Sequence, residues 1–285
     1  MTLAAPPIAR TVADLRAQVA TWKSAGARVA LVPTMGGLHD GHLALVRRAR
    51  ELADRVVTSL FVNPTQFAPG EDFETYPRDE ARDAALLAAN GCDLLYAPTA
   101  REMYPSGFST TVTVAEVSAP LDGLSRPQHF AGVATVVSKL LNQCAPDVAV
   151  FGEKDYQQLL VIRRLARDLD MPVEIVGLPT VRDADGLALS SRNAYLTPAE
   201  RPIAGQLNAV IKAVAEAIGA GEPVDEVEAR ALAALTQAGF QRIDYLEVRG
   251  AADLARLGPG PTTTPARVFV AARLGRTRLI DNWQV

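Results

Sequence analysis

The 285-residue sequence has little cysteine, histidine or lysine, and it has no long hydrophobic run. Its two cysteines, Cys92 and Cys144, lie 52 residues apart and form no CxxC pair. Neither a disulfide framework nor a zinc ribbon is therefore expected, and we predict two buried free thiols. No apolar stretch reaches the ~20 residues of a membrane-spanning helix. The N-terminal segment also lacks the pattern of a secretory signal, so we expect a cytoplasmic protein.

An excess of basic charge is also missing. The 29 Lys and Arg residues face 32 Asp and Glu residues, which gives a net charge of −3 and a pI near 5.7. This balance argues against a nucleic-acid footprint and against a polybasic membrane patch. With 48% hydrophobic and 21% charged residues, the chain can bury a core, which excludes global disorder. Its length favours about two domains.

Short apolar runs alternate with helical patterns through the first two-thirds of the chain. Strands are expected at 28–34, 55–64, 92–99, 147–152 and 173–181, and helices at 42–54, 77–91, 132–144 and 153–170. This alternation predicts βαβ crossovers and a parallel sheet. Two helices, then three strands, are expected at 197–221, 224–240, 243–248, 266–274 and 277–283. We therefore predict an α/β domain over 1–182 and a smaller α+β domain over 183–285.

The strongest chemical signal is PTMGGLHDGH, residues 33–42. A strand ends at Pro33, two glycines follow, and a helix is expected to begin near His39. A helix N-terminus attracts phosphate, and His39 and His42 share one face of its first turn. Gly41 leaves room for a flat base. The segment suits a nucleoside triphosphate at the carboxyl end of a strand. The alternative is a surface pair of histidines, which the strand–Gly-Gly–helix setting disfavours.

A second signal is FGEKDYQQ, residues 151–158, where another strand ends at a glycine. Lys154 is one of only four lysines in the chain, and it stands in the first turn of the expected helix. A cation is mildly unfavourable there, so a phosphate ligand would explain it, with Asp155 available for Mg²⁺. The alternative is a solvated helix start without a ligand.

Two further segments carry weaker signals. LALSSRN, residues 187–193, offers two hydroxyls and an arginine that could hold phosphate oxygens, although a simple turn before the next helix is favoured for this segment by itself. LFVNPTQF, residues 60–67, ends a strand and then offers the uncharged amide of Gln66. That amide could bind a hydroxyl or a carboxylate without adding charge.

Six segments together resemble the pantothenate synthetase (pantoate–β-alanine ligase) family. In chain order they are PTMGGLHDGH, FVNPTQF, YPRD, GVATVVSKLLNQ, FGEKDYQQ and LALSSRNAYL. The resemblance runs from about residue 10 to the C-terminus, where IDYLEV and RLIDN also fit. The HxGH segment alone is shared with many nucleotidyl-transferring enzymes, so the order and spacing of all six carry the assignment.

The resemblance implies a Rossmann-like N-terminal domain, a smaller C-terminal lid domain, a homodimer and a cytoplasmic location. It implies condensation of pantoate with β-alanine through a pantoyl adenylate, with ATP as co-substrate, Mg²⁺ as the metal, and AMP and pyrophosphate as the released products. Chemistry agrees, because a carboxylate becomes an acyl donor only after it gains a leaving group. The stabilising cations and donors would be His39, His42, Lys154 and Arg192.

The family's residue roles carry over onto matching positions. His42 is the usual proton donor, Gln66 would contact both pantoate and β-alanine, Gln158 would contact pantoate, and Asp155 would hold Mg²⁺. The implied ATP-binding residues are Pro33, Met35, Gly36, Gly37, Leu38, His39, Asp40, Gly41, His42, Gly152, Glu153, Lys154, Asp155, Val181, Leu189, Ser190, Ser191 and Arg192.

One segment departs from the family pattern. The family commonly has Arg-Pro-Gly-His-Phe-Asp-Gly where this chain has Arg-Pro-Gln-His-Phe-Ala-Gly at residues 126–132. Gln128 and Ala131 are the replacements, so the role of this loop is open. Two other functions compete with the ligase: a plain nucleotidyltransferase and a nucleotide-sensing module without turnover. Amine-dependent release of AMP would distinguish the ligase from the transferase.

Overall fold

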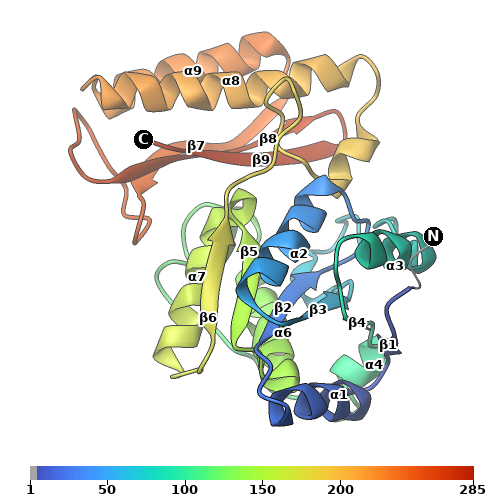
Figure 1. Ribbon diagram of the computed structural model, residues 1–285. Helices are drawn as coiled ribbons and strands as arrows, with labels where there is room; N and C mark the ends of the chain where they lie inside the picture. Colours follow the sequence, from blue (N-terminus) through green and yellow to red (C-terminus); the bar gives the residue numbers. More distant parts are fainter. Residues whose placement is uncertain (1–4) are drawn as a thin grey trace. The chain divides into compact units, whose positions relative to one another are not determined.

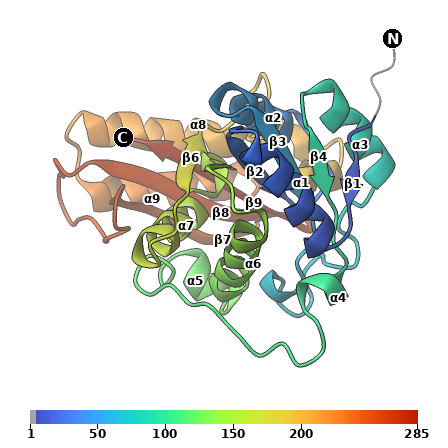
Figure 2. The same ribbon diagram turned by 60° about the horizontal axis from the view of Figure 1, so that its bottom comes forward.

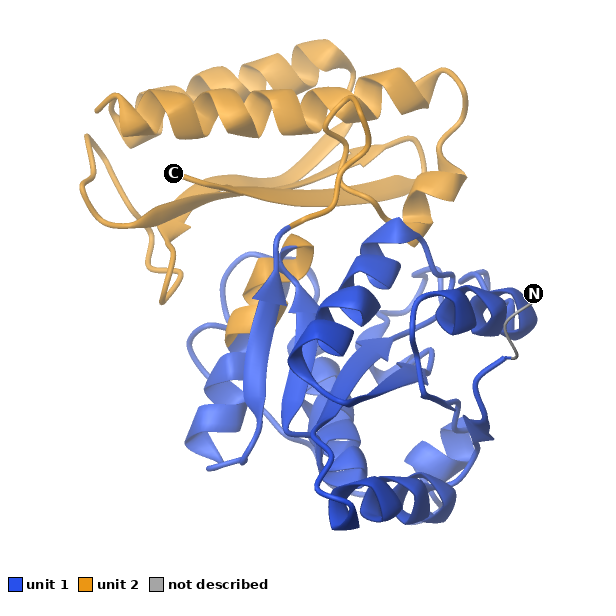
Figure 3. Cartoon of the chain, in the orientation of Figure 1, with its two compact units in different colours: residues 1–153, 161–179 blue, residues 154–160, 180–285 orange. Residues whose placement is uncertain are grey.

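The computed structural model describes residues 5–285 and divides into two compact units. Unit 1 comprises Met1–Glu153 and Val161–Pro179, and unit 2 comprises Lys154–Leu160 and Thr180–Val285 (Figure 3). Residues 1–4, part of the segment expected not to be a secretory signal, lie outside the described residues. None of the helices in the described part is both long and apolar enough to cross a bilayer.

Unit 1 is built on a six-stranded sheet in which every neighbouring pair is parallel (Figure 1). The order is β1-β4-β3-β2-β5-β6, and the parallel sheet expected from the sequence is confirmed. The strands are β1 (Ile8–Ala9), β2 (Val29–Thr34), β3 (Arg55–Leu60), β4 (Leu94–Tyr96), β5 (Val148–Gly152) and β6 (Glu174–Leu178). The two-residue β1 was not expected, because it is too short to carry a periodic pattern.

Helices cover this sheet, and three helices of this part of the chain, α1, α4 and α5, were not predicted. Apolar residues of α2 and α3 join those of the strands in one buried cluster, and α1 packs against α6 (Figure 2). Both cysteines are free and buried, as expected. The helices are α1 (Val12–Ser24), α2 (Asp40–Leu52), α3 (Glu80–Ala89), α4 (Ala100–Met103), α5 (Asp122–Ser125), α6 (His129–Cys144) and α7 (Tyr156–Asp168).

Unit 2 places two helices on a three-stranded antiparallel sheet of order β7-β8-β9 (Figure 1). The elements are α8 (Glu200–Gly219), α9 (Val224–Ala238), β7 (Arg242–Gly250), β8 (Ala266–Leu274) and β9 (Thr277–Gln284). Alternate β8 residues, among them Val268 and Val270, enter the apolar core under the helices. Gly275, at φ +55°, makes the expected turn between β8 and β9.

The chain reverses its direction of travel across the sheet beside β2. Strands β3 and β4 extend the sheet on one side of β2, whereas β5 and β6 extend it on the other. Ligands of open α/β sheets bind at the carboxyl ends of strands at such a switch point. Short 3-10 turns follow two of these strands, η1 (Pro64–Gln66) after β3 and η2 (Glu153–Asp155) after β5. The helix expected over 153–170 thus begins later, with α7 at Tyr156.

Candidate active site

A side chain of α3 holds the turn that follows β2 in place. Gly36 and Gly37 adopt φ of +91° and +62°, and a Cβ on Gly36 would lie 2.6 Å from the side chain of Leu60. The carboxylate of Asp83 accepts the backbone N–H groups of Gly37 and Leu38, both at 2.9 Å. Asp83 is fully buried, so the protein itself fixes this turn.

The two histidines of the turn cap the helix that follows. His39 is the N-cap of α2, and its Nδ1 accepts the Gly41 N–H at 3.2 Å. The Nδ1 of His42 accepts the His39 N–H at 3.4 Å, and the two rings lie 4.1 Å apart between centroids. A neutral ring whose Nδ1 accepts a hydrogen bond carries its proton on Nε2. Both rings therefore have Nε2–H as their donor, which suits contact with phosphate oxygens.

Gln66, the last residue of the short turn η1, contacts this segment through its side chain. The side-chain amide of Gln66 contacts the Met35 sulfur at 3.1 Å and accepts a hydrogen bond from Asn63 Nδ2, also at 3.1 Å. Asn63 is itself buried, and its Oδ1 accepts the Tyr104 hydroxyl at 2.8 Å. Unit 1 thus brings the side chain of Gln66 to the PTMGG turn.

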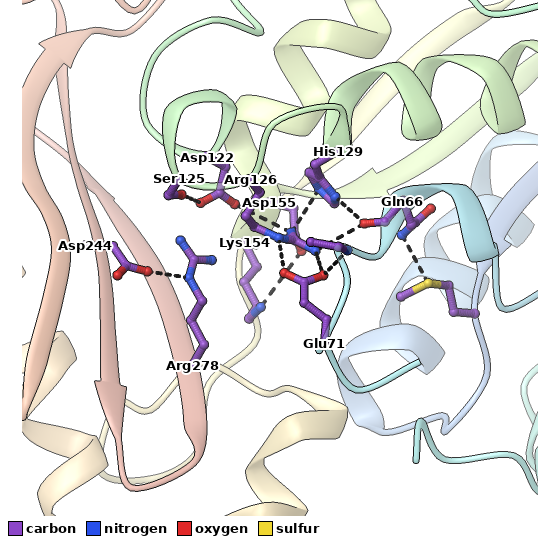
Figure 4. Close-up of polar contacts among 12 residues, drawn as sticks. Gln66, Glu71, Asp122, Ser125, Arg126, His129, Lys154, Asp155, Asp244 and Arg278 are labelled. Carbon is purple, nitrogen blue, oxygen red and sulfur yellow. Dashed lines mark hydrogen bonds and ion pairs between the residues drawn. The ribbon is translucent and has the colours of Figure 1, made fainter. Parts of the chain in front are cut away.

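A partly buried ion pair fixes the backbone of Gln66 (Figure 4). Arg126 donates from Nε and Nη2 to the two carboxylate oxygens of Glu71, each at 2.7 Å. Arg126 also donates to the Gln66 carbonyl at 3.3 Å, and His129 Nδ1 lies 2.8 Å from the same oxygen. Burial raises the pKa of Glu71, but the hydrogen bonds and charge of Arg126 outweigh it and hold that pKa below its ordinary value.

The loop that departs from the family pattern now has a structural account. Gln128 stands at φ +73° at the N-cap of α6, where a glycine would be unstrained. Gly132, which matches the family, allows a close approach: a Cβ there would lie 2.4 Å from the Thr65 carbonyl oxygen. The Gly132 carbonyl accepts Asn63 Nδ2 at 3.2 Å. The loop therefore packs directly against η1 and supports Gln66.

In unit 2, Lys154 and Asp155 follow one another in η2. The Lys154 Nζ lies 3.9 Å from the Asp155 carboxylate, which is about half exposed. The backbone oxygen of Lys154 accepts a hydrogen bond from Asn282 Nδ2 at 2.9 Å. Gln158 lies farther along the chain in the first half of α7 and is partly buried.

Two further predicted ATP-binding residues, Gly152 and Glu153, lie in unit 1, at the end of β5 and the start of η2. The other five, Val181, Leu189, Ser190, Ser191 and Arg192, lie in a hairpin-like segment of unit 2. The Leu189 N–H donates to the Val181 carbonyl at 3.0 Å, so these two residues are brought together. Ser190 caps the short turn η3 (Ser191–Tyr195), its hydroxyl accepting the Arg192 N–H at 3.3 Å. Residues 191–195 thus form a short turn, and Ser191 and Arg192 come directly after the Val181–Leu189 pair.

Sequence reasoning missed Asp83, Glu71 and Asn282. Asp83 carried a usable signal, since a carboxylate stands beside Ala84 and Leu87 on the buried face of α3. Glu71 and Asn282 carried none, because their partners Arg126 and Lys154 lie 55 and 128 residues away. Among the predicted residues, Leu38 has its side chain in the core, and its backbone N–H and carbonyl are hydrogen-bonded to Asp83 and Arg82.

Comparisons with known proteins agree on one family. The model of the pantoate–β-alanine ligase family matches residues 7–284. The pantothenate synthetase of Caulobacter vibrioides is 61% identical, covering 99% of this chain and all of that protein, and that of Paramagnetospirillum magneticum is 60% identical over 96% of both.

Solved structures agree in fold. The pantothenate synthetase from Thermus thermophilus matches with a TM-score of 0.92 and 50% identity, covering 98% of this chain and 99% of that one. The pantoate–β-alanine ligase from Francisella tularensis, complexed with β-γ ATP and β-alanine, matches with a TM-score of 0.81 and 32% identity over 98% of both chains. This chain belongs to the pantoate–β-alanine ligase family.

Proposed function

We propose that this chain, as a pantoate–β-alanine ligase, makes pantothenate in two half-reactions through a pantoyl adenylate. In the first, a pantoate carboxylate oxygen attacks the α-phosphorus of ATP and pyrophosphate leaves. In the second, the amine of β-alanine attacks the activated carbonyl carbon, the bond to AMP breaks and the amine loses a proton. Membership of the family and a relative complexed with β-γ ATP and β-alanine support these substrates.

The observation that carries this proposal is the pair of histidines at the start of α2. The first half-reaction joins two anions and builds negative charge on phosphate oxygens, so positioned donors provide most of the stabilisation. His39 and His42 meet that need with Nε2–H groups whose rings are fixed by backbone hydrogen bonds. His42 is assigned as the proton donor to the phosphates, and Lys154 and Arg192 as the cations of unit 2.

The substrate contacts are assigned along the same lines. ATP is assigned to residues 33 and 35–42 of unit 1, to residues 152–155, and to Val181 and residues 189–192. Gln66 is assigned to both pantoate and β-alanine, and Gln158 to pantoate. Support for the dual role of Gln66 comes from its fixed backbone and from its amide, which can meet a hydroxyl or a carboxylate without added charge.

Mg²⁺ is assigned to Asp155. Within the described residues, no group of three or more His, Cys, Asp or Glu side chains could hold a metal ion. The half-exposed Asp155 carboxylate therefore fits a cation that arrives with most of its oxygen ligands from the nucleotide and water, as Mg²⁺ does. When bound, the metal would neutralise phosphate charge, and Lys154, next to Asp155 in the chain, would contribute a second positive charge.

Pyrophosphate–ATP isotope exchange tests the two-step order. We expect exchange to require pantoate and Mg²⁺ but not β-alanine, because the adenylate forms before the amine enters. An absolute need for β-alanine would rule out a free-standing adenylate. AMP release must in turn depend on β-alanine; a nucleotidylated product released without any amine would favour a plain nucleotidyltransferase, and no turnover at all would favour a sensing module.

Three broader expectations are part of the same proposal. Residues 1–182 form a Rossmann-like domain, and residues 183–285 act as a lid domain. The lid excludes water from the hydrolysable adenylate. The chain works as a homodimer, and it works in the cytoplasm. Sedimentation of the purified protein at micromolar concentration checks the dimer directly: a single species at twice 30.4 kDa is the expected result.

A further inference from the structure

The side chain of Asn282, on β9, connects two segments of unit 2 that are distant in sequence. It is 2% exposed. Its Nδ2 donates to the backbone oxygen of Lys154 at 2.9 Å, and its Oδ1 accepts a hydrogen bond from the Arg267 guanidinium. Its own N–H is bonded to the Asp281 carboxylate at 2.8 Å. A buried amide with partners on both its oxygen and its nitrogen has one orientation only.

Arg267 fixes the residue on the other side of Asp155. Its guanidinium carbon lies 3.8 Å from the centre of the Tyr156 ring, and the Tyr156 hydroxyl donates to the Ala251 carbonyl at 3.1 Å. Arg267 and Asn282 lie on adjacent antiparallel strands, β8 and β9. The Arg267–Asn282 pair therefore holds both Lys154 and Tyr156, so that η2 is anchored on this sheet.

The Lys154 side chain needs such an anchor. Within unit 2, its Nζ is paired with Asp155 at 3.9 Å, which is a long contact and holds a flexible side chain weakly. The backbone of Lys154 fixes where its four-carbon stem begins, and so sets the region that its Nζ can reach. Electrostatic stabilisation of a transition state depends on that placement, and an error of about 1 Å can cost on the order of 100-fold in rate.

We propose that Asn282, held by Arg267, is a positioning residue that fixes the backbone of Lys154 for the adenylation half-reaction. The inference rests on the role proposed above for Lys154. Asn282 touches neither substrate in this account, and it acts only through the Lys154 carbonyl. Its loss should therefore lower kcat of pyrophosphate–ATP exchange and leave the KM for pantoate nearly unchanged.

Asn282→Asp is the decisive variant. The aspartate keeps an oxygen for Arg267 but replaces the Nδ2 donor with a second oxygen facing the Lys154 carbonyl. We expect a folded protein whose exchange kcat falls about 10-fold to 100-fold, in line with one lost positioning contact. Asn208→Ala is the matched control, because Asn208 is a buried asparagine of the same unit, on α8; its kcat should stay within about twofold of the wild type, the scale of a lost contact away from the chemistry.

A double-mutant cycle with Lys154→Ala separates positioning from general structure. If Asn282 acts through Lys154, adding Asn282→Asp to Lys154→Ala lowers the rate little further. If Lys154→Ala is slow and Asn282→Asp lowers its rate by the same factor as in the wild type, the proposed role of Asn282 is refuted, whereas the role of Lys154 is not. A folded Asn282→Asp variant with wild-type kcat refutes it as well. A Lys154→Ala variant that keeps the exchange rate instead refutes the role proposed for Lys154.

Discussion

The carboxylate of Asp83 on α3 accepts the backbone N–H of Gly37 at 2.9 Å, across 46 residues of sequence. Its other oxygen accepts the N–H of Leu38. A buried carboxylate thus occupies two backbone amides just before the helix start that was expected, from sequence, to attract phosphate. A ligand there would depend more on His39 and His42 and on the residues that follow than on these two amides.

Asp83→Asn should loosen this turn. The amide that replaces one oxygen presents an N–H to a backbone N–H, so a buried donor loses its partner, at a cost of about 1–3 kcal/mol. We expect lower stability in urea unfolding and a higher KM for ATP in pyrophosphate–ATP exchange. Asp79→Asn is the control, because Asp79 caps the same helix through the Arg82 N–H but does not touch the turn. Equal effects of the two variants on the KM for ATP would contradict the assignment.

Gly132→Ala should displace η1. The added Cβ would lie 2.4 Å from the Thr65 carbonyl oxygen. The nearest atoms are all backbone atoms of Thr65 and Gln66, so no flexible side chain can move aside. We expect a raised KM for pantoate, because Gln66 follows Thr65 directly, together with a loss of stability of about 1–3 kcal/mol, as for overpacking in a core.

The matched control for that variant is Gly219→Ala. Gly219 ends α8, and a Cβ there would meet nothing within 4 Å. Its substitution should leave the KM for pantoate unchanged and stability equal or slightly higher, since alanine is the better helix former. A Gly132→Ala enzyme with the wild-type KM would show that α6 does not set the position of Gln66.

The Glu71–Arg126 pair predicts a pH dependence of stability. Burial raises the pKa of Glu71, but Arg126 outweighs burial, so the pKa in the folded protein lies below the ordinary value of 4.5. A carboxyl group with a lowered folded pKa stabilises the protein above its unfolded pKa, and this contribution is lost as pH falls through the folded pKa.

We therefore expect wild type to exceed Glu71→Gln in unfolding free energy at pH 7, with the difference shrinking once pH falls below about 4.5. Urea unfolding at a series of pH values measures it. Arg126→Gln should weaken the same dependence, because Arg126 provides the main lowering of the Glu71 pKa. A difference that grows on acidification would have the wrong sign for this ion pair.

Gln128→Gly should stabilise the protein slightly. Gln128 is exposed, stands at φ +73° and makes no side-chain cap hydrogen bond. In the left-handed conformation, a residue with a Cβ is destabilised by roughly 1–2 kcal/mol of backbone strain. Glycine avoids this strain, but its greater loss of chain entropy on folding costs about 0.5–1 kcal/mol. We expect a gain between about 0 and 1 kcal/mol by these two terms. Gln128→Ala keeps the Cβ and should give no gain; equal stability of the two variants would exclude backbone strain as the cause.

Local patterns in the sequence determined the fold class and the main chemical segments. Buried apolar runs alternating with helical periodicity predicted the parallel sheet and the smaller α+β part, and both are present. The Gly-Gly turn followed by two histidines predicted a helix start near His39, and α2 begins at Asp40 with His39 as its N-cap. These features depend on residues within a few positions of one another, so spacing alone reveals them.

Only the tertiary structure decided which groups hold those segments in place. Asp83 reaches Gly37, Arg126 reaches Glu71 and Asn282 reaches Lys154 across 46, 55 and 128 residues. Each is a directional hydrogen bond between groups that are far apart in the sequence and are brought together by the tertiary fold. Local spacing sets which residues share a helix face or a strand, but which distant carboxylate or amide meets a given backbone group depends on how the whole unit packs.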